Sequence, residues 1–125
     1  MAEKTILIVE DDESISNMYQ TKLKQLGLNI LTATDGANGL EAAKKEKPDL
    51  ILLDVILPQL DGFSVLADLR KGKDTAKIPV VMLTNLSTTE DQEKANKLGA
   101  NGYIVKASVT PAEVSGIVQK LLNLK

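Results

Sequence analysis

The chain has 125 residues, of which 43% are hydrophobic and 26% charged, with 15 Lys and Arg against 17 Asp and Glu. This length and balance are typical of one globular domain, and no apolar run approaches the ~20 residues of a membrane helix. Because the chain has no Cys and no His, disulfides, thiolate nucleophiles, zinc–thiolate sites and imidazole catalysis are excluded. A net charge of −2 and only three aromatic residues provide neither a basic surface nor a stacking platform for nucleic acid.

The first half of the chain alternates short apolar segments with amphipathic segments of helical spacing. Gly27 is expected to stop the first helix, and Pro48 to end the second. The segment 50–53 is apolar on both faces, which is typical of a strand buried on both sides. In chain order we expect a strand at 5–9, a helix at 13–26, a strand at 28–33, a helix at 35–45 and a strand at 50–53.

The second half continues the same alternation. Two capping boxes, at Ser87 with Glu90 and at Thr110 with Glu113, predict helix starts, and Pro111 suits a first helical position. After the helix marked by Phe63, Leu66 and Leu69, we expect a strand at 80–83, a helix at 87–98, a strand at 103–105 and a final helix to about 122.

Five strands alternating with five helices predict an α/β fold with a doubly wound parallel sheet. Right-handed crossovers leave few arrangements, and the flavodoxin-like strand order 2-1-3-4-5 is the one we expect. Without a linker or an internal repeat, residues 1–125 are expected to form one domain with no output domain attached. The first strand-like segment follows Lys4 at once, which leaves no room for a signal peptide and predicts a cytoplasmic protein.

The predicted helix at 87–98 is unusually polar, because Ala95 and Leu98 are its only apolar residues. Such a helix is weakly anchored to a core. It is either a solvated surface helix or a mobile element that binds a partner, and the residues alone favour the first interpretation.

In an open parallel sheet, ligands bind at the carboxyl ends of the strands, where the strand order switches. With the order 2-1-3-4-5, this places Glu10, Asp11 and Asp12 after the first strand beside Asp54 after the third. The next two strands end in Thr84 and Lys106. Each residue alone has an ordinary explanation, such as a helix cap, a turn or a surface lysine. Their gathering at one edge of the sheet favours a functional site.

The combination makes chemical sense for phosphoryl transfer. Carboxylates held close together repel one another unless a cation neutralises them, and oxygen ligands without His or Cys suit Mg²⁺ or Mn²⁺. An ammonium and a hydroxyl opposite the metal would bind the remaining oxygens of a phosphoryl group. The carboxylate of Asp54 could then act as the nucleophile.

Over nearly its whole length the chain resembles the receiver domain of the response regulators of two-component signal transduction, in particular the single-domain chemotaxis regulators. The resemblance depends on four segments in the right order and spacing. They are Ile6-Leu7-Ile8-Val9-Glu10-Asp11-Asp12, the segment from Pro48 to Gly62 that contains Asp54, Val81-Met82-Leu83-Thr84, and Gly99-Ala100-Asn101-Gly102-Tyr103-Ile104-Val105-Lys106.

The resemblance implies a role for each matching residue. Asp54 corresponds to the phosphoacceptor, Asp11 to a direct metal ligand, and Glu10 to a ligand through water. The backbone carbonyl of Ile56 would complete the metal ligands, so that Glu10, Asp11, Asp54 and Ile56 form the expected metal site.

The same resemblance implies how the signal is passed on. Thr84 corresponds to the switch hydroxyl, Tyr103 to a coupled aromatic that changes rotamer, and Lys106 to the cation that pairs with the phosphoryl oxygens. The implied output surface runs from the fourth strand to the last helix. The implied partners are a sensor histidine kinase or a histidine phosphotransfer protein and an unknown downstream target. A monomer is expected, with dimerisation on phosphorylation left open.

Two positions depart from the family pattern. Asn85 follows the switch hydroxyl where a small residue is usual, and Ala107 follows the lysine where proline is usual, often in a cis bond. Because a non-proline cis bond costs ~2.5–4 kcal/mol, we expect a trans bond and a shifted loop at Ala107. Ile56 and Leu86, each two residues beyond a site residue, are apolar and predict slow loss of the phosphoryl group, because neither can bind an attacking water.

Three other functions compete with the phosphorylation switch. A receiver fold used as a phosphorylation-independent adaptor is the main alternative. The intact acidic cluster, Asp54, Thr84 and Lys106 argue against it, whereas the two departures leave it open. A Mg²⁺-dependent phosphoester hydrolase would need a general acid two residues after its nucleophile, where Ile56 stands. A flavin or dinucleotide carrier would need a glycine-rich loop after the first strand, which the sequence lacks.

Overall fold

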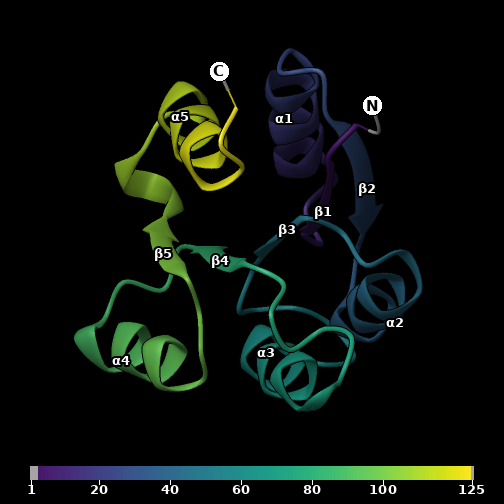
Figure 1. Ribbon diagram of the computed structural model, residues 1–125. Coiled ribbons are helices and arrows are strands. Elements are labelled where there is room, and N and C mark those ends of the chain that lie inside the picture. Colours follow the sequence, from purple (N-terminus) through teal and green to yellow (C-terminus); the bar gives the residue numbers. More distant parts are fainter. Residues whose placement is uncertain (1–2, 125) are drawn as a thin grey trace.

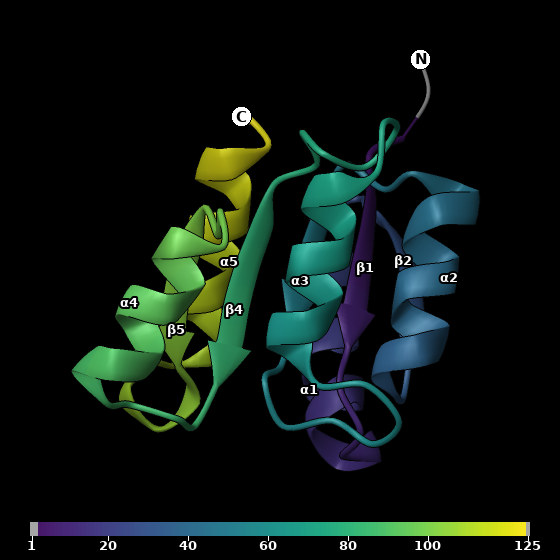
Figure 2. The same ribbon diagram turned by 90° about the horizontal axis from the view of Figure 1, so that it is seen from below.

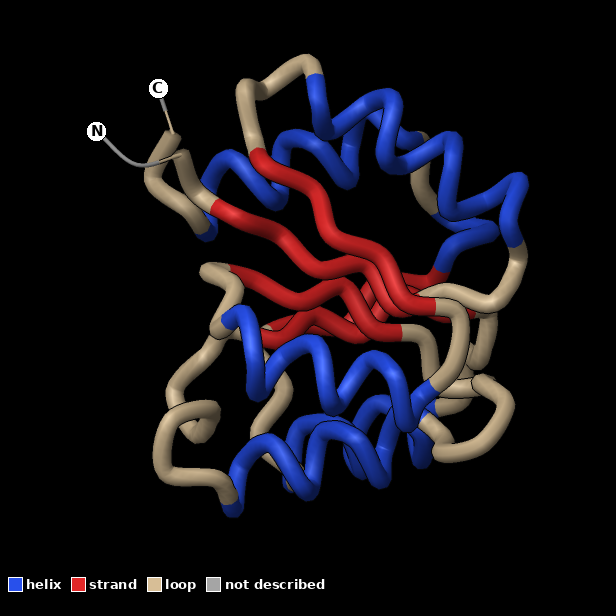
Figure 3. The backbone as a smooth tube through the Cα atoms, turned by 90° about the vertical axis from the view of Figure 1, so that its right-hand side faces the viewer, coloured by secondary structure: helices blue, strands red, loops and turns tan. Residues whose placement is uncertain are grey.

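The computed structural model describes residues 3–124, so that Met1, Ala2 and Lys125, at the ends of the expected domain, lie outside it. Five parallel strands form a single sheet in the order β2-β1-β3-β4-β5, which confirms the predicted topology. Helices α1 and α5 cover one face of the sheet, and α2, α3 and α4 cover the other (Figures 1 and 2). Seen from the side, the sheet lies between two layers of helices (Figure 3). The strands are β1 (Thr5–Val9), β2 (Asn29–Ala33), β3 (Leu50–Leu53), β4 (Val80–Thr84) and β5 (Gly102–Val105).

The five helices lie within a few residues of the predicted ranges. A short 3₁₀ turn, η1 (Lys106–Ser108), separates β5 from the last helix and was not predicted. In the described part of the chain, no helix has the length and apolar character needed to cross a membrane. The helices are α1 (Glu13–Lys24), α2 (Gly36–Glu46), α3 (Gly62–Lys71), α4 (Thr89–Lys97) and α5 (Pro111–Leu121).

The three central strands are apolar on both sides because both faces of the sheet are covered. All four residues of β3 and all five of β4 are buried. Alternate residues of each strand therefore contribute to two separate cores. Leu7, Ile51 and Met82 lie in the core beneath α2, α3 and α4. Ile8 and Leu52 lie in the core beneath α1 and α5.

Helix α4 begins differently from the prediction. The predicted cap was Ser87, but the observed N-cap is Thr88, whose hydroxyl accepts a hydrogen bond from the Asp91 N–H at 3.1 Å. The same hydroxyl donates to the Asp91 carboxylate at 2.7 Å, so that Thr88 and Asp91 replace Ser87 and Glu90. The capping box of α5, formed by Thr110 and Glu113, is present as predicted.

Candidate metal and phosphoryl site

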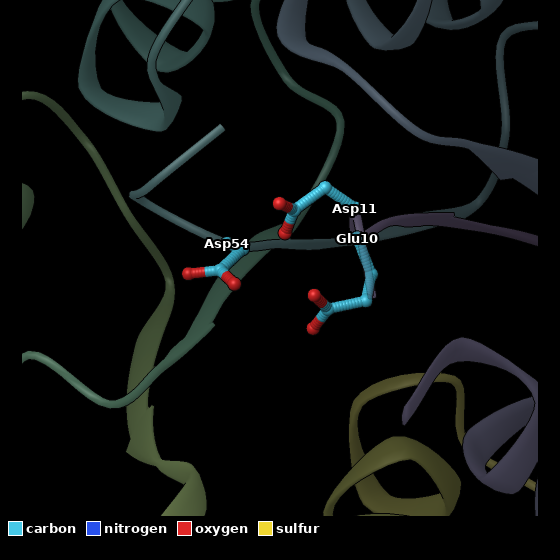
Figure 4. Close-up of side chains that lie close together, drawn as sticks. All are labelled: Glu10, Asp11 and Asp54. Atoms are coloured by element: carbon cyan, nitrogen blue, oxygen red, sulfur yellow. The ribbon is translucent and has the colours of Figure 1, made fainter. Parts of the chain in front are cut away.

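Three carboxylates meet at the carboxyl end of the sheet. Strands β1 and β3 are neighbours with Val9 opposite Leu53, so the residues that follow them, Glu10 and Asp54, also lie side by side. One carboxylate oxygen from each of Glu10, Asp11 and Asp54 lies within 4.8 Å of the others (Figure 4). Glu10 and Asp54 are 4% and 7% exposed, whereas Asp11 is exposed to solvent. The cluster is thus a buried pair of acids with one open side.

The backbone around Asp54 is held on both sides. Its N–H donates to the carbonyl of Val9 at 3.1 Å, which extends the β1–β3 pairing by one residue. The N–H of Gly62 donates to the carbonyl of Val55 at 2.8 Å. A Cβ at Gly62 would lie only 2.0 Å from the carbonyl oxygen of Asp54, so the close approach of α3 requires glycine.

Lys106 reaches across the sheet to the same acids. Its ammonium donates to Asp54 Oδ2 at 2.7 Å and to Glu10 Oε1. Burial lowers the pKa of Lys106, but the hydrogen bonds to Asp54 and Glu10 outweigh it and leave the pKa above its ordinary value. Burial raises the pKa of Glu10 by more than its hydrogen bonds from Lys106 and from the Asp12 N–H lower it. Lys106 therefore stays charged and is directed at the carboxylate of Asp54.

Thr84 is fully buried at the end of β4, and its register with Val105 places it beside the strand that carries Lys106. Its hydroxyl accepts a hydrogen bond from the Leu86 N–H at 3.4 Å. Tyr103 lies in the neighbouring edge strand, β5, and its hydroxyl donates a hydrogen bond to the Leu86 carbonyl at 2.7 Å. Burial, and then the charges of Asp91 and Asp54, raise the pKa of the Tyr103 phenol. Thr84 and Tyr103 thus contact the same β4–α4 loop residue.

The structure brings together most of the residues that the sequence predicted. Glu10, Asp11, Asp54 and Lys106 meet directly, and Asp12 caps α1 by accepting from the Ile15 N–H at 3.0 Å, as its ordinary explanation predicted. The side chain of Ile56 is 62% exposed, and its N–H donates to Asp54 Oδ1 at 3.3 Å.

Sequence reasoning treated Asn85 and Ala107 as two separate departures and missed the contact between them. The Ala107 N–H donates to Asn85 Oδ1 at 3.1 Å. No sequence signal shows this pairing, because it depends on the register of β4 with β5. The described residues contain no cis peptide bond, which confirms the expected trans bond at Ala107.

The donor set fits a hard divalent cation. All three clustered groups are carboxylates, and with Lys106 as the neighbouring cation their formal charges sum to −2, three negative against one positive. Mg²⁺ and Mn²⁺ prefer oxygen ligands and take one or two carboxylates with several waters. The exposed side at Asp11 leaves room for such waters. Fold and site together define a doubly wound α/β protein with an acidic cluster and a neighbouring lysine suited to a divalent cation and a phosphoryl group.

Comparison with known proteins identifies the family. The response regulator receiver domain model matches residues 6–119. The chain is 42% identical to the alkaline phosphatase synthesis transcriptional regulatory protein PhoP of Bacillus subtilis over 96% of its own length and 49% of that protein. The chain therefore belongs to the response regulator receiver domain family. It spans about half the length of the curated relatives it matches.

Solved structures agree with this assignment. The chemotaxis protein CheY4 of Vibrio cholerae superposes with a TM-score of 0.88 and 30% identity, over 96% of this chain and 99% of that one. The receiver domain of the sensor histidine kinase PA1611 of Pseudomonas aeruginosa, solved with magnesium in its active-site cleft, gives 0.87 and 30%, over 98% and 99%. These matches show that solved receiver domains share both the fold and the length of this chain.

Proposed function

We propose that Asp54 accepts a phosphoryl group from the phosphohistidine of a sensor histidine kinase or a histidine phosphotransfer protein. One observation carries the proposal: the buried Asp54 carboxylate belongs to an acidic cluster that can hold a divalent cation and is also paired with the ammonium of Lys106. In this proposal Glu10, Asp11, Asp54 and the Ile56 carbonyl hold Mg²⁺ or Mn²⁺. The location is cytoplasmic, where such kinases present their phosphohistidine.

The transfer is a displacement at phosphorus. A carboxylate oxygen of Asp54 forms a P–O bond as the P–N bond to the donor imidazole breaks, and the imidazole leaves with the bonding electrons and takes up a proton. A cation held by the acidic cluster would neutralise charge on the phosphoryl oxygens. Lys106, already paired with Asp54 Oδ2, is placed to pair with an oxygen of the new aspartyl phosphate.

The signal would leave the site through Thr84 and Tyr103. The Thr84 hydroxyl now accepts from the Leu86 N–H, and a phosphoryl oxygen would offer it a charged acceptor to donate to. Its movement would disturb the Leu86 segment that the Tyr103 hydroxyl holds. The affected surface is β4–α4–β5–α5. Its downstream target is a protein. The matched curated relatives are named as transcriptional regulators and are about twice as long as this chain.

The aspartyl phosphate should be long-lived. Ile56 presents an exposed apolar side chain beside Asp54, and Leu86 is half-buried beyond Thr84, so neither can orient an attacking water. We expect the double variant Ile56→Asn/Leu86→Glu to lose its phosphoryl group faster than the parent, as measured by the decay of the phosphorylated mass. An equal decay rate would show that these two positions do not set the lifetime.

The test is the intact mass of the protein after incubation with acetyl phosphate and Mg²⁺. The proposal predicts a gain of one phosphoryl group that is lost in Asp54→Ala and in the absence of metal. Asp61→Ala is the matched control, because Asp61 is an exposed cap of α3 in the loop that follows Asp54. Equal gain in Asp54→Ala would refute the proposal. If the parent gains no phosphoryl group and does not bind beryllofluoride, a phosphoryl mimic, the adaptor function replaces the proposed one.

A further inference from the structure

The turn that carries Lys106 is attached to the neighbouring strand by one side chain. Strands β4 and β5 pair up to Thr84 and Val105, where the backbone ladder ends. Immediately beyond, Asn85 Oδ1 accepts the Ala107 N–H at 3.1 Å. Lys106 is therefore bracketed by a residue in the ladder on one side and by a residue bonded to Asn85 on the other.

Little else fixes the peptide after Lys106. At the end of η1, the N–H of the following residue, Val109, donates to the Lys106 carbonyl over 3.5 Å, which is at the outer limit for a hydrogen bond. Asn85 and Ala107 are both exposed, so packing contributes little to holding them. The bond from Asn85 is the shorter of the two, and it joins this turn to the loop that follows Thr84.

The direction of this bond also fixes the orientation of the Asn85 amide. A backbone N–H can only donate, so the atom that faces Ala107 must be the amide oxygen. The identities at the two positions depend on each other, because proline at 107 would have no N–H to donate and a small residue at 85 would have no acceptor to offer. Asn85, Lys106 and Ala107 line a common cavity of about 320 Å³ with residues of α1.

We infer that Asn85 is a positioning residue for Lys106: its side-chain oxygen holds the peptide after Lys106 and so keeps the ammonium directed at Asp54. This inference rests on the proposed function, in which Lys106 binds the phosphoryl oxygens. Asn85 and Ala107 are then one hydrogen-bonded pair rather than two separate departures from the family pattern.

The test compares variants that separate the bond from the bulk of the side chain. Asn85→Leu keeps the branched shape and removes the acceptor, Asn85→Asp keeps an acceptor oxygen, and Ala107→Pro removes the donor. The first readout is hydrogen exchange of the Ala107 amide. We expect exchange about five-fold faster in Asn85→Leu, the factor for one net hydrogen bond, and unchanged protection in Asn85→Asp.

The second readout is the affinity for beryllofluoride with Mg²⁺. We expect about three- to ten-fold weaker binding in Asn85→Leu, and no further weakening when Asn85→Leu is added to Ala107→Pro, where no bond is left to lose. Equal weakening in both backgrounds would overturn the inference. So would faster amide exchange with unchanged affinity, because the bond would then be structural only. If the parent itself binds no beryllofluoride, the proposed function fails, and the positioning of Lys106 fails with it even if the Ala107 exchange confirms the bond.

Discussion

Helices α3 and α4 pack on the same face of the sheet, but they are anchored very differently. Helix α3 buries Phe63, Val65, Leu66 and Leu69 among its ten residues. Helix α4 buries only Ala95 among its nine residues. The two helices are also joined by a cation–π contact, with the ammonium of Lys94 4.7 Å from the centre of the Phe63 ring.

The difference matches the position of each helix relative to Asp54. Helix α3 begins directly against the backbone of Asp54, so any movement there would displace the acceptor itself. Helix α4 follows the loop of Leu86, which is held by one hydrogen bond from the Tyr103 hydroxyl and a long one to Thr84. Weakly anchored elements are the ones that open at low free-energy cost. The central strands thus keep the site rigid. We expect α4 and the loop before it to be the part that moves when the site is phosphorylated.

The largest expected effect tests the anchoring of the two helices directly. Leu66→Ala in α3 removes a fully buried side chain and should lower the free energy of unfolding by about 2–5 kcal/mol. Leu98→Ala at the end of α4 removes a half-buried side chain and should cost only about 1 kcal/mol. Denaturant unfolding measures both. Equal losses would mean that α4 is anchored as firmly as α3.

A smaller effect is expected where α3 meets the site. Gly62→Ala places a Cβ 2.0 Å from the Asp54 carbonyl oxygen, so the backbone must move, at a cost of about 1–3 kcal/mol. Gly116→Ala in α5 is the control, because a Cβ there meets nothing within 4 Å and should stabilise the helix by about 0.5–1 kcal/mol. Gly62→Ala should also slow phosphorylation by acetyl phosphate, whereas Gly116→Ala should not. Unchanged stability in Gly62→Ala would show that the loop yields freely.

The smallest effect concerns the two tyrosines. Tyr19 is buried in the core that α1 and α5 cover, and Tyr103 lies on the β4–α4–β5 edge. Burial raises the pKa of both phenols above the ordinary value of 10.0. A raised pKa means that the folded state holds the proton more tightly, so this stabilisation is complete below pH 10 and is lost as the pH rises through the folded pKa.

The ultraviolet absorbance of tyrosinate follows this titration without interference, because the chain has no Trp. Tyr19→Phe leaves the signal of Tyr103 alone, and Tyr103→Phe leaves that of Tyr19. Each phenol should ionise above its ordinary pKa in the folded protein and at its ordinary pKa in urea. Ordinary titration of Tyr103 in the folded protein would contradict its burial against the core.

The fold and the acidic cluster could be predicted because they depend on regular features of the sequence. Apolar runs such as 50–53 identify the central strands, and the chirality of parallel crossovers then leaves few strand orders, of which the expected one is observed. Once the order is known, the residues after β1 and β3 must be neighbours, which places Glu10 and Asp11 beside Asp54. The signal is strong because each step uses backbone geometry rather than a particular side-chain contact.

Contacts between loops could not be predicted in the same way. Ser87, Thr88 and Thr89 all offer hydroxyls, and the choice of Thr88 as the cap of α4 depends on where the preceding loop leaves the sheet. The bond between Asn85 and Ala107 depends on the register of two strands and on the turn after Lys106. Such contacts are decided by tertiary structure, which the local pattern of residues does not contain.

The most direct test of the central claim identifies the carboxylate that carries the phosphoryl group. The protein is incubated with acetyl phosphate and Mg²⁺, the acyl phosphate is reduced with borohydride to an alcohol, and the modified residue is located by peptide mass mapping. We predict homoserine at position 54 and unmodified Asp11 and Glu10, because in the proposed function Asp54 is the acceptor, whereas Glu10 and Asp11 would hold the cation. Modification at Asp11 or Glu10 instead of Asp54 would contradict this account of the site.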